Sequence, residues 1–166
     1  QNLTGSYNAT LGEQTLYNNT TGASNTALGY AAMIANTTGQ ANTSCGTQAL
    51  SSNTTASYNT AVGYYALQSN TTGYNNTGVG YQAGTNLTTS TQSTVVGLNA
   101  GYTATTGTLT GVGSGALYKV TTGTENVALG YNAGYELTTG SHNIMLGDHT
   151  GSYTVLLATG SKNTII

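Results

Sequence analysis

The sequence predicts an all-β fold, a parallel β-solenoid (a β-roll or β-helix) wound in coils of about 17 residues. A glycine recurs every 17 residues through almost the whole chain, and the residues between are rich in Asn, Thr, Ala and Val. β-Branched residues favour strands over helices, while the frequent Gly and Asn favour turns. We therefore expect each coil to contain two short strands and two turns, stacked at about 4.8 Å per coil.

The recurring glycine closes a motif of the form Asn-Thr-Ala-Leu-Gly, and we call it the marker glycine. Its positions are Gly12, Gly29, Gly46, Gly63, Gly80, Gly97, Gly113, Gly130 and Gly147. One step, from Gly97 to Gly113, is 16 residues long, which a solenoid would absorb as a one-residue deletion in a loop. A tenth copy begins at Gly160 after a longer connection. Residues 1–166 are thus expected to form a single repeat domain of about ten coils.

Composition excludes several classes of function. Only 4% of the 166 residues are charged, and the formal net charge is −2. Lys119 and Lys162 are the only basic residues apart from two histidines, too few to neutralise a nucleic acid backbone or bind a membrane surface. No run of 18 apolar residues occurs either, so no membrane-spanning helix is expected. Neither a nucleic acid nor a membrane is therefore an expected partner. The single cysteine, Cys45, replaces a Leu or Val of other repeats and is expected to be buried apolar filler.

Residues at equivalent positions of the repeats form columns along the predicted stack. Four residues before the marker glycine the column is Asn8, Asn25, Asn42, Asn59, Asn76, Asn126 and Asn143, with Asn163 in the tenth copy. Stacked amides hydrogen-bond along cross-β assemblies, so these residues are predicted to form a structural ladder. Directly before the glycine an apolar column runs from Leu11 to Leu146, and three residues after it an alanine column runs from Ala32 to Ala133. The small alanines predict a thin coil.

Two further columns exchange volume. Repeats with a large residue four places after the marker glycine, such as Leu50, carry an asparagine three residues later, such as Asn53. Repeats with Gly84 or Gly134 at the first position carry leucine at the second. This exchange predicts that both columns share one packed interior.

One side of the coil is expected to need a partner. Alternate residues of a strand point to opposite faces, and both faces of the Asn-Thr-Ala-Leu segment are small or apolar. Whichever face is interior, the other carries an apolar stripe that a solitary soluble chain would rarely expose. We therefore expect further copies of the chain to cover this stripe, in a homotrimer or a filament. The pattern leaves open which face is interior and leaves a two-chain packing as an alternative.

Segments such as Asn59-Thr60-Ala61-Val62-Gly63 resemble the tandem-repeat shafts of tail-fibre-domain proteins of bacteriophages and bacteria. More loosely, Asn25-Thr26-Ala27-Leu28-Gly29 is similar to the Asn-Ser-Val-Ala-Ile-Gly motif in the head repeats of trimeric autotransporter adhesins. The resemblance covers nearly the whole chain, and it implies a homotrimeric extracellular fibre on a virion tail or a cell surface. It implies a rigid repeat shaft that binds a host surface protein or glycan, with this chain a fragment of a longer fibre. No enzyme activity and no cofactor are expected.

The few ionisable residues offer weak alternatives to this reading. A glycosidase needs two carboxylates facing one bond, and Glu13, Glu125, Glu136 and Asp148 are the only acids. They are expected to be solvated surface charges rather than catalytic groups. His142, Asp148 and His149 are residue types that bind metals, but their spacing matches no strong metal motif, so no metal site is predicted.

Threonine and tyrosine columns provide the remaining hypotheses. Pairs of threonines recur in eight repeats, from Thr20-Thr21 to Thr138-Thr139, and regular threonine ranks on a flat solenoid face would suit an ice-binding protein. The pairs lie next to a turn and point in opposite directions, which favours a structural role and leaves ice binding as the alternative function. Directly after the marker glycine lie the candidate glycan contacts Tyr30, Tyr64, Tyr81 and Tyr131. Packing over the turn is the competing role for these rings.

Overall fold

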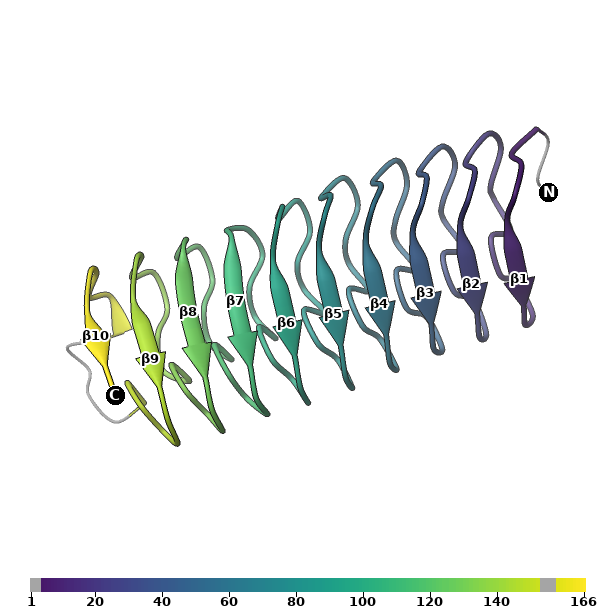
Figure 1. The fold of residues 1–166 in the computed structure, drawn as a ribbon. Helices are drawn as coiled ribbons and strands as arrows, with labels where there is room; N and C mark the ends of the chain where they lie inside the picture. The colour runs from purple at the N-terminus through teal and green to yellow at the C-terminus, as the bar shows by residue number, and fades with distance from the viewer. Residues whose placement is uncertain (1–3, 153–157) are drawn as a thin grey trace.

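The computed structural model describes residues 4–152 and 158–166, and in these residues the chain is a parallel β-solenoid of about nine coils. Ten short strands form one sheet in sequence order, so that the coils stack into a rod with the termini at opposite ends (Figure 1). The strands are β1 (Ala9–Leu11), β2 (Thr26–Leu28), β3 (Thr43–Cys45), β4 (Thr60–Val62), β5 (Thr77–Val79), β6 (Thr94–Val96), β7 (Leu109–Val112), β8 (Asn126–Leu129), β9 (Ile144–Leu146) and β10 (Thr164–Ile165). The predicted fold class is confirmed.

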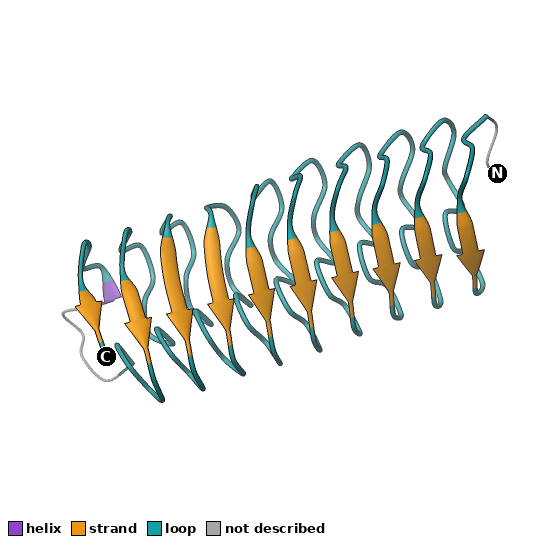
Figure 2. Cartoon of the chain, in the orientation of Figure 1, coloured by secondary structure: helices purple, strands orange, loops and turns teal. Residues whose placement is uncertain are grey.

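Each described coil contains one strand, not the two that the sequence predicted (Figure 2). The return side of the coil is a succession of tight turns with several residues at positive φ, such as Gln48 (54°) and Leu50 (51°). Backbone in that left-handed region does not continue a strand. These turns still bond to the next coil, as when Leu50 N–H donates to the Ala66 carbonyl at 3.1 Å.

The register between strands preserves the repeat. Thr43 pairs with Thr60 and Val62 pairs with Val79, 17 residues further on. The short repeat also keeps its register, because Thr94 pairs with Thr110. The missing residue lies in the turn before β7, as predicted for a loop deletion. The longer connection before the tenth copy includes residues 153–157, which lie outside the described residues.

The middle residue of β2 to β6 and of β9 faces the interior. Ala27, Ala61 and Val95 are fully buried, whereas their neighbours on the strand are partly exposed. The apolar column that precedes the marker glycine therefore lies on the outside of the sheet, with Leu129 51% exposed. Cys45 belongs to this column and is half-buried with a free thiol, so the expectation that it is buried filler was wrong. The strand alternates faces at every residue, and the interior takes the smaller column.

The marker glycines permit the close approach of successive coils. A Cβ atom on Gly29 would lie 2.7 Å from the carbonyl carbon of Gly46, and Gly29 has a φ of 121°. Both the contact and the backbone conformation exclude larger residues. The 17-residue glycine repeat thus records a backbone stacking requirement.

In the described residues no helix is long and apolar enough to cross a membrane.

The interior is one continuous core in which the exchange of volume between columns is confirmed. Leu50 and Leu67 are fully buried where the sequence has large residues, and Leu87 and Leu137 are buried where the large group has moved. A Cβ atom on Gly134 would lie 2.9 Å from Cδ2 of Leu117, so there is no room for a side chain at that position. The core thus keeps its packing while the identity of the large residue changes.

Candidate functional site

The predicted asparagine column lies inside the coil at the start of each strand. Asn42 shows its bonding: its Oδ1 accepts from the backbone N–H of Asn59 at 2.9 Å, and its Nδ2 donates to the Ala56 carbonyl at 2.9 Å. Its own N–H donates to Asn25 Oδ1, also at 2.9 Å. The amides therefore bond mainly to the backbone of the adjacent coil, with direct amide contacts as a second contribution. The Oδ1 atoms of Asn8, Asn59 and Asn126 accept the equivalent hydrogen bond from the backbone N–H of the asparagine in the next coil.

A second ladder lies on the return side, and sequence reasoning missed it. Asn36 Nδ2 donates to Asn19 Oδ1 at 2.7 Å, and Asn53 Nδ2 donates to Asn36 Oδ1 at 2.7 Å. The ladder stops where Leu87 takes the next place, and the buried Oδ1 of Asn70 has no hydrogen-bond partner there. The four asparagines recur at 17-residue spacing, and this regular spacing was the signal that could have predicted the ladder. They were interpreted only as the smaller partner in the exchange of volume between two columns.

The outer surface of the sheet carries two columns, which we call the sheet face. In β2 to β7 the first column is Thr26, Thr43, Thr60, Thr77, Thr94 and Thr110. The second column is Leu11, Leu28, Cys45, Val62, Val79, Val96, Val112, Leu129 and Leu146. Neither column contains a charged residue. The sheet face is thus a flat, uncharged strip with an apolar half and a hydroxyl-bearing half.

The paired threonines lie at a corner of the coil, away from the sheet face. The first threonine of a pair bonds to the next coil, as Thr20 Oγ1 donates to the Thr37 carbonyl at 2.9 Å. Thr37 repeats the bond to Thr54 at 3.0 Å. The second threonine of these pairs is exposed. One hydroxyl of each such pair therefore stabilises the stack, and the other remains available at the surface.

The carboxylates that the sequence analysis singled out lie on the surface beside basic groups. Glu136 Oε1 lies 2.8 Å from Lys119 Nζ, and Glu125 Oε2 lies 3.1 Å from His142 Nε2. Asp148 Oδ1 lies 2.8 Å from His149 Nδ1, and Glu13 is exposed. Within residues 4–152 and 158–166, no group of three His, Cys, Asp or Glu side chains is placed to hold a metal ion.

The four predicted glycan-contact tyrosines are all exposed, and the structure does not bring them into one site. Tyr64 and Tyr81 stack with ring centroids 5.4 Å apart, and Tyr65 contacts Tyr64 at 4.0 Å. Tyr30 lies two coils from Tyr64, with Thr47 between them in the column. Tyr131 is 54% exposed and meets the edge of the His149 ring at 5.0 Å.

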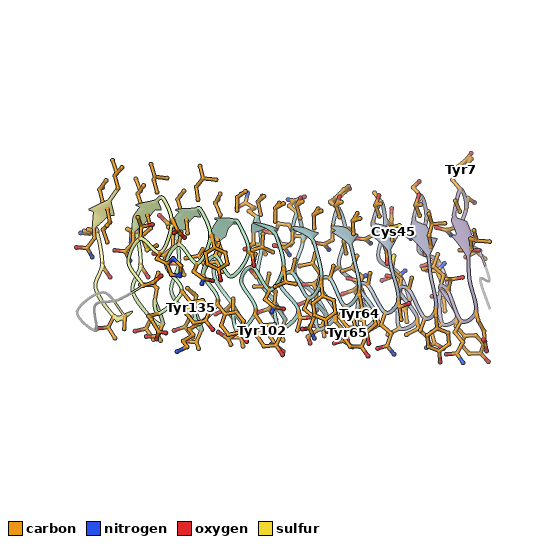
Figure 3. The ribbon with its side chains drawn as sticks, turned by 90° about the horizontal axis from the view of Figure 1, so that it is seen from below. Tyr7, Cys45, Tyr64, Tyr65, Tyr102 and Tyr135 are labelled. Atoms are coloured by element: carbon orange, nitrogen blue, oxygen red, sulfur yellow. The ribbon has the colours of Figure 1, made fainter. Side chains whose placement is uncertain are left out.

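A continuous tyrosine stack was missed by sequence reasoning. Tyr118 lies between Tyr102 and Tyr135, with ring centroids 5.1 and 4.8 Å apart and nearly parallel ring planes. Burial is the first cause of the raised pKa of Tyr118, followed by its two tyrosine neighbours. Figure 3 shows Tyr64, Tyr102 and Tyr135 along the side of the rod opposite the strands. The three residues of the stack, Tyr102, Tyr118 and Tyr135, lie at the same distance after a marker glycine, which was the signal that could have found them.

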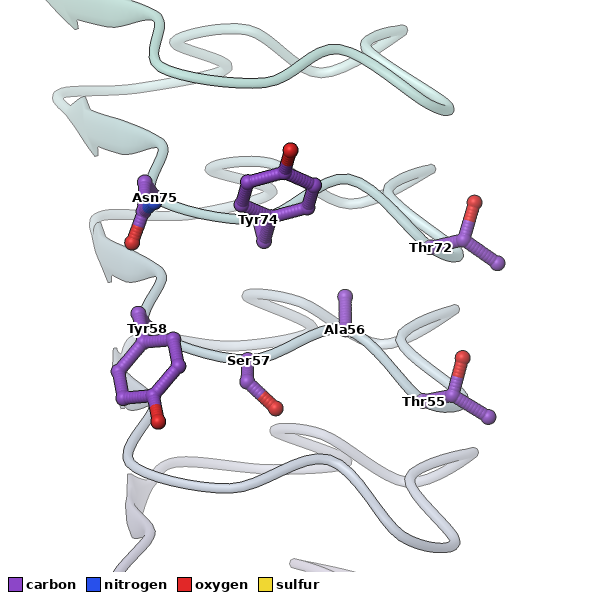
Figure 4. Close-up of a pocket in the computed structure, with 7 residues that line it drawn as sticks. All are labelled: Thr55, Ala56, Ser57, Tyr58, Thr72, Tyr74 and Asn75. Atoms are coloured by element: carbon purple, nitrogen blue, oxygen red, sulfur yellow. The ribbon is translucent and has the colours of Figure 1, made fainter.

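Among the hollows on the surface of the described coils, two have several tyrosines in their walls. The larger is a shallow recess of about 510 Å³, in which Tyr58 and Tyr74 stand over a floor of Ala56 and Ser57 (Figure 4). Both rings are at least half exposed, and the Ser57 hydroxyl accepts from the backbone N–H of Gln40 at 3.0 Å. This recess is open and apolar.

The second hollow, of about 310 Å³, lies where one coil carries Ser114 and Gly115 between larger residues of the coils on either side. We call it the Gly115 notch. Leu98 and Asn99 form one wall and Tyr131 and Asn132 form the other. Tyr118 and Tyr135 of the tyrosine stack close its third side.

The fold and these surfaces define the class of protein as a single-sheet parallel β-solenoid with an uncharged outer sheet face and tyrosines on the opposite side. Comparison with protein-family models, curated proteins and solved structures finds no match to this chain. The function is therefore argued from the surfaces themselves.

Proposed function

We propose that this chain is a segment of an extracellular fibre, a rigid and non-catalytic repeat shaft in which the sheet faces of three copies pack together. The observation that carries the proposal is the sheet face. It runs along the rod without a charged residue, and its second column consists of Leu, Val and Cys side chains. A continuous apolar strip of this kind marks an interaction surface in a soluble protein.

The exposures along the sheet face favour burial by a flat partner. Leu11 is 73% exposed and Leu129 51% exposed, while Val62 and Val79 are half-buried between their neighbours. The strands are short and nearly identical, so the surface repeats itself every coil. A second copy of the same chain offers a surface with the same repeat, which is why self-association fits better than an unrelated partner. Three copies is the number that the resemblance to trimeric fibre shafts implies.

Rigidity would come from the hydrogen bonds between coils. In the coils that carry them, the two asparagine ladders and the first threonine of each threonine pair bond successive coils through buried or half-buried groups. Stability in such stacks depends on each coil and its neighbours, so a long shaft remains ordered along its length. The carboxylates beside Lys119, His142 and His149 lie at the surface, which agrees with a non-catalytic role for them in the proposed shaft.

The proposal is tested by the mass of the particle in solution. Static light scattering on the purified full chain is expected to give three times the 16.8 kDa chain mass. Val79→Lys places a charge in the middle of the sheet face and should release monomers, since an unpaired buried charge is costly. Ser52→Lys is the matched control, because it adds the same charge in the column that holds Lys119 naturally. A monomeric wild type, or an unchanged mass in Val79→Lys, would contradict the proposal.

Ice binding remains a second candidate, favoured by the threonine column of the sheet face rather than by the threonine pairs. Six successive strands place a threonine outward, and β-branched threonine has a restricted χ1. This gives a regular rank of hydroxyl and methyl groups at strand spacing. A monomer with measurable thermal hysteresis that is lost in Thr77→Lys would favour this function over the fibre.

A further inference from the structure

We propose that the Gly115 notch binds one uncharged sugar residue of a surface glycan. The inference rests on the proposed surface-exposed fibre and gives it a specific ligand site. Three features carry it: a local break in two bulky columns, a buried amide oxygen without a partner, and aromatic walls on two sides.

The notch exists because one coil departs from the repeat. Directly after the marker glycine, the coils on either side carry Leu98 and Tyr131, whereas this coil carries Ser114. The flanking coils are two stacking steps apart, about 10 Å, which leaves space for one sugar ring between their side chains. The volume of about 310 Å³ is at the lower end of the range for small-molecule pockets.

The floor of the notch is a glycine onto which the next coil packs. A Cβ atom on Gly115 would overlap Oδ1 of Asn132 and would lie 3.4 Å from Cδ2 of Tyr135. Its φ of 68° is shared by other residues of the column, such as Asn99 at 55°, so the backbone alone does not require glycine. The missing side chain lets the Asn132 amide pack directly over Gly115, so a larger residue would have to displace this amide, which forms one wall of the notch.

The polar groups of the notch suit hydroxyl ligands. Asn99 lines the notch, and its buried Oδ1 has no hydrogen-bond partner. A buried acceptor without a partner is costly, so a small rotation of the Asn99 side chain that brings Oδ1 to a sugar hydroxyl, which is a donor, would be favourable. Asn132, on the opposite wall, has its Nδ2 3.3 Å from His149 Nε2, so a neighbouring side chain orients that amide.

The aromatic groups suit the apolar C–H surface of the same ligand. Tyr131 is 54% exposed at the wall of the notch, and the edge contact with His149 leaves much of its ring accessible. Tyr118 and Tyr135 are fixed in their stack at 4.8 Å, so they would bind with little loss of side-chain freedom. Tyrosine combines an apolar ring with a polar hydroxyl, which matches the two kinds of surface on a sugar.

The charge around the notch favours a neutral ligand. None of the lining residues is charged, and burial raises the pKa of Tyr118, so its hydroxyl stays protonated. Two basic side chains adjoin the notch: Lys119 Nζ lies 2.8 Å from Glu136, and His149, which contacts Tyr131 and Asn132, has its Nδ1 2.8 Å from Asp148. An acidic sugar would find no free cation here.

The notch would stay accessible in the proposed fibre. Figure 3 shows Tyr102 and Tyr135 on the side of the rod opposite the strands. Packing of copies through the sheet face therefore leaves the tyrosine stack facing outward. Each copy in a shaft would present its own notch.

The test uses saturation-transfer NMR and titration calorimetry on the full chain. The probes are the methyl glycosides of glucose, galactose, mannose and N-acetylglucosamine, with glucuronic and sialic acid as charged comparisons. We expect at least one neutral glycoside to bind, with a Kd on the order of 1 mM. Asn99→Ala should weaken binding about three- to tenfold, the effect of one hydrogen bond. Alanine is tolerated there, since Ala31 holds the equivalent position at a φ of 53°.

Ser114→Tyr should abolish binding, because it fills the notch with the residue that Tyr81 and Tyr131 already place in this column. Two variants serve as controls and should bind normally: Thr47→Tyr makes the same change in another coil, and Tyr74→Ala removes an aromatic ring from the other recess.

The sugar site is overturned if no neutral glycoside binds, if only the acidic sugars bind, or if Ser114→Tyr leaves the affinity unchanged. The light-scattering mass of each sample separates this result from the fate of the fibre proposal. A trimer that binds no sugar contradicts the site alone, whereas a monomer that binds sugar contradicts the fibre alone.

Discussion

The Cβ atom that Gly84 lacks would lie 2.8 Å from Cδ1 of Leu87, three residues further along the chain. The same position would lie 3.0 Å from Cγ2 of Val95 in the following strand. Three columns therefore compete for one space: the turn position of Gly84, the later position of Leu87 and the middle of the next strand. Where the turn residue is large, as at Leu67, the strand residue that follows is small, as at Gly78.

Gly84→Leu alone is expected to overpack the core and to lower the free energy of unfolding by about 1–3 kcal/mol. The triple variant Gly84→Leu, Leu87→Asn, Val95→Ala adopts the pattern of the coil with Leu50 and Asn53 and should recover most of this loss. Urea denaturation followed by circular dichroism measures both. Equal destabilisation of the single and triple variants would show that the three columns do not share a space.

The sequence was sufficient to predict the coil, its register and two of these three columns. A glycine repeat reports the close backbone contact between coils directly, so the 17-residue spacing determined the stack. The inward strand column was missed because Ala27, Gly78 and Val95 share no residue type. The side of the sheet that faces inward also remained open, since both candidate columns are apolar or small.

The second strand was wrongly predicted for a related reason. Residues such as Leu50 and Met33 are typical of strands or helices by composition, yet they occupy left-handed backbone at a φ of 51°. Stacking on identical turns above and below maintains a conformation that local propensity disfavours. The Gly115 notch was equally hidden, because it depends on which side chains of three successive coils meet.

The asparagine ladder should dominate local stability. Asn42→Ala leaves the buried Asn59 N–H without an acceptor and removes one of the two donors to the Ala56 carbonyl, which keeps the bond from Asn53 Nδ2. A loss of about 1–3 kcal/mol is expected, the cost of one unsatisfied buried group. Asn18→Ala is the control: this asparagine is exposed, alanine holds the equivalent position at Ala35, and the change should cost less than about 0.5 kcal/mol. Similar losses in the two variants by urea denaturation would count against the ladder.

Alkaline pH should weaken the fold around the tyrosine stack. Burial raises the pKa of Tyr118, and the hydrogen bond to Glu136 raises the pKa of Lys119. Both groups therefore hold a proton more tightly in the folded chain than in the unfolded one. Their contribution is complete below the ordinary pKa values near about 10 and is lost as pH rises through the raised values.

Melting temperatures between about pH 8 and pH 11.5 measure this loss. The double variant Tyr118→Phe, Lys119→Met lacks both titrating groups and should lose less stability over the same interval. An equal or larger loss in the double variant would assign the alkaline sensitivity to other groups.

Cys45 offers a chemical probe of the sheet face. Its thiol is free and is half-buried in the isolated chain, so a monomer should react readily with a maleimide. In the proposed fibre the same thiol lies between copies, and its reaction should be slowed at least about tenfold, with the full rate returning in Val79→Lys. Mass spectrometry of timed samples gives the rate. Fast labelling of the wild type would indicate an open sheet face.

The most direct test of the central claim is electron cryo-microscopy of the purified assembly. We predict a rod of three solenoids with their sheet faces turned inward and with the tyrosine stack of Tyr102, Tyr118 and Tyr135 on the outside. A monomeric solenoid with Thr60 and Val62 open to solvent would contradict the fibre and would make ice binding the leading function.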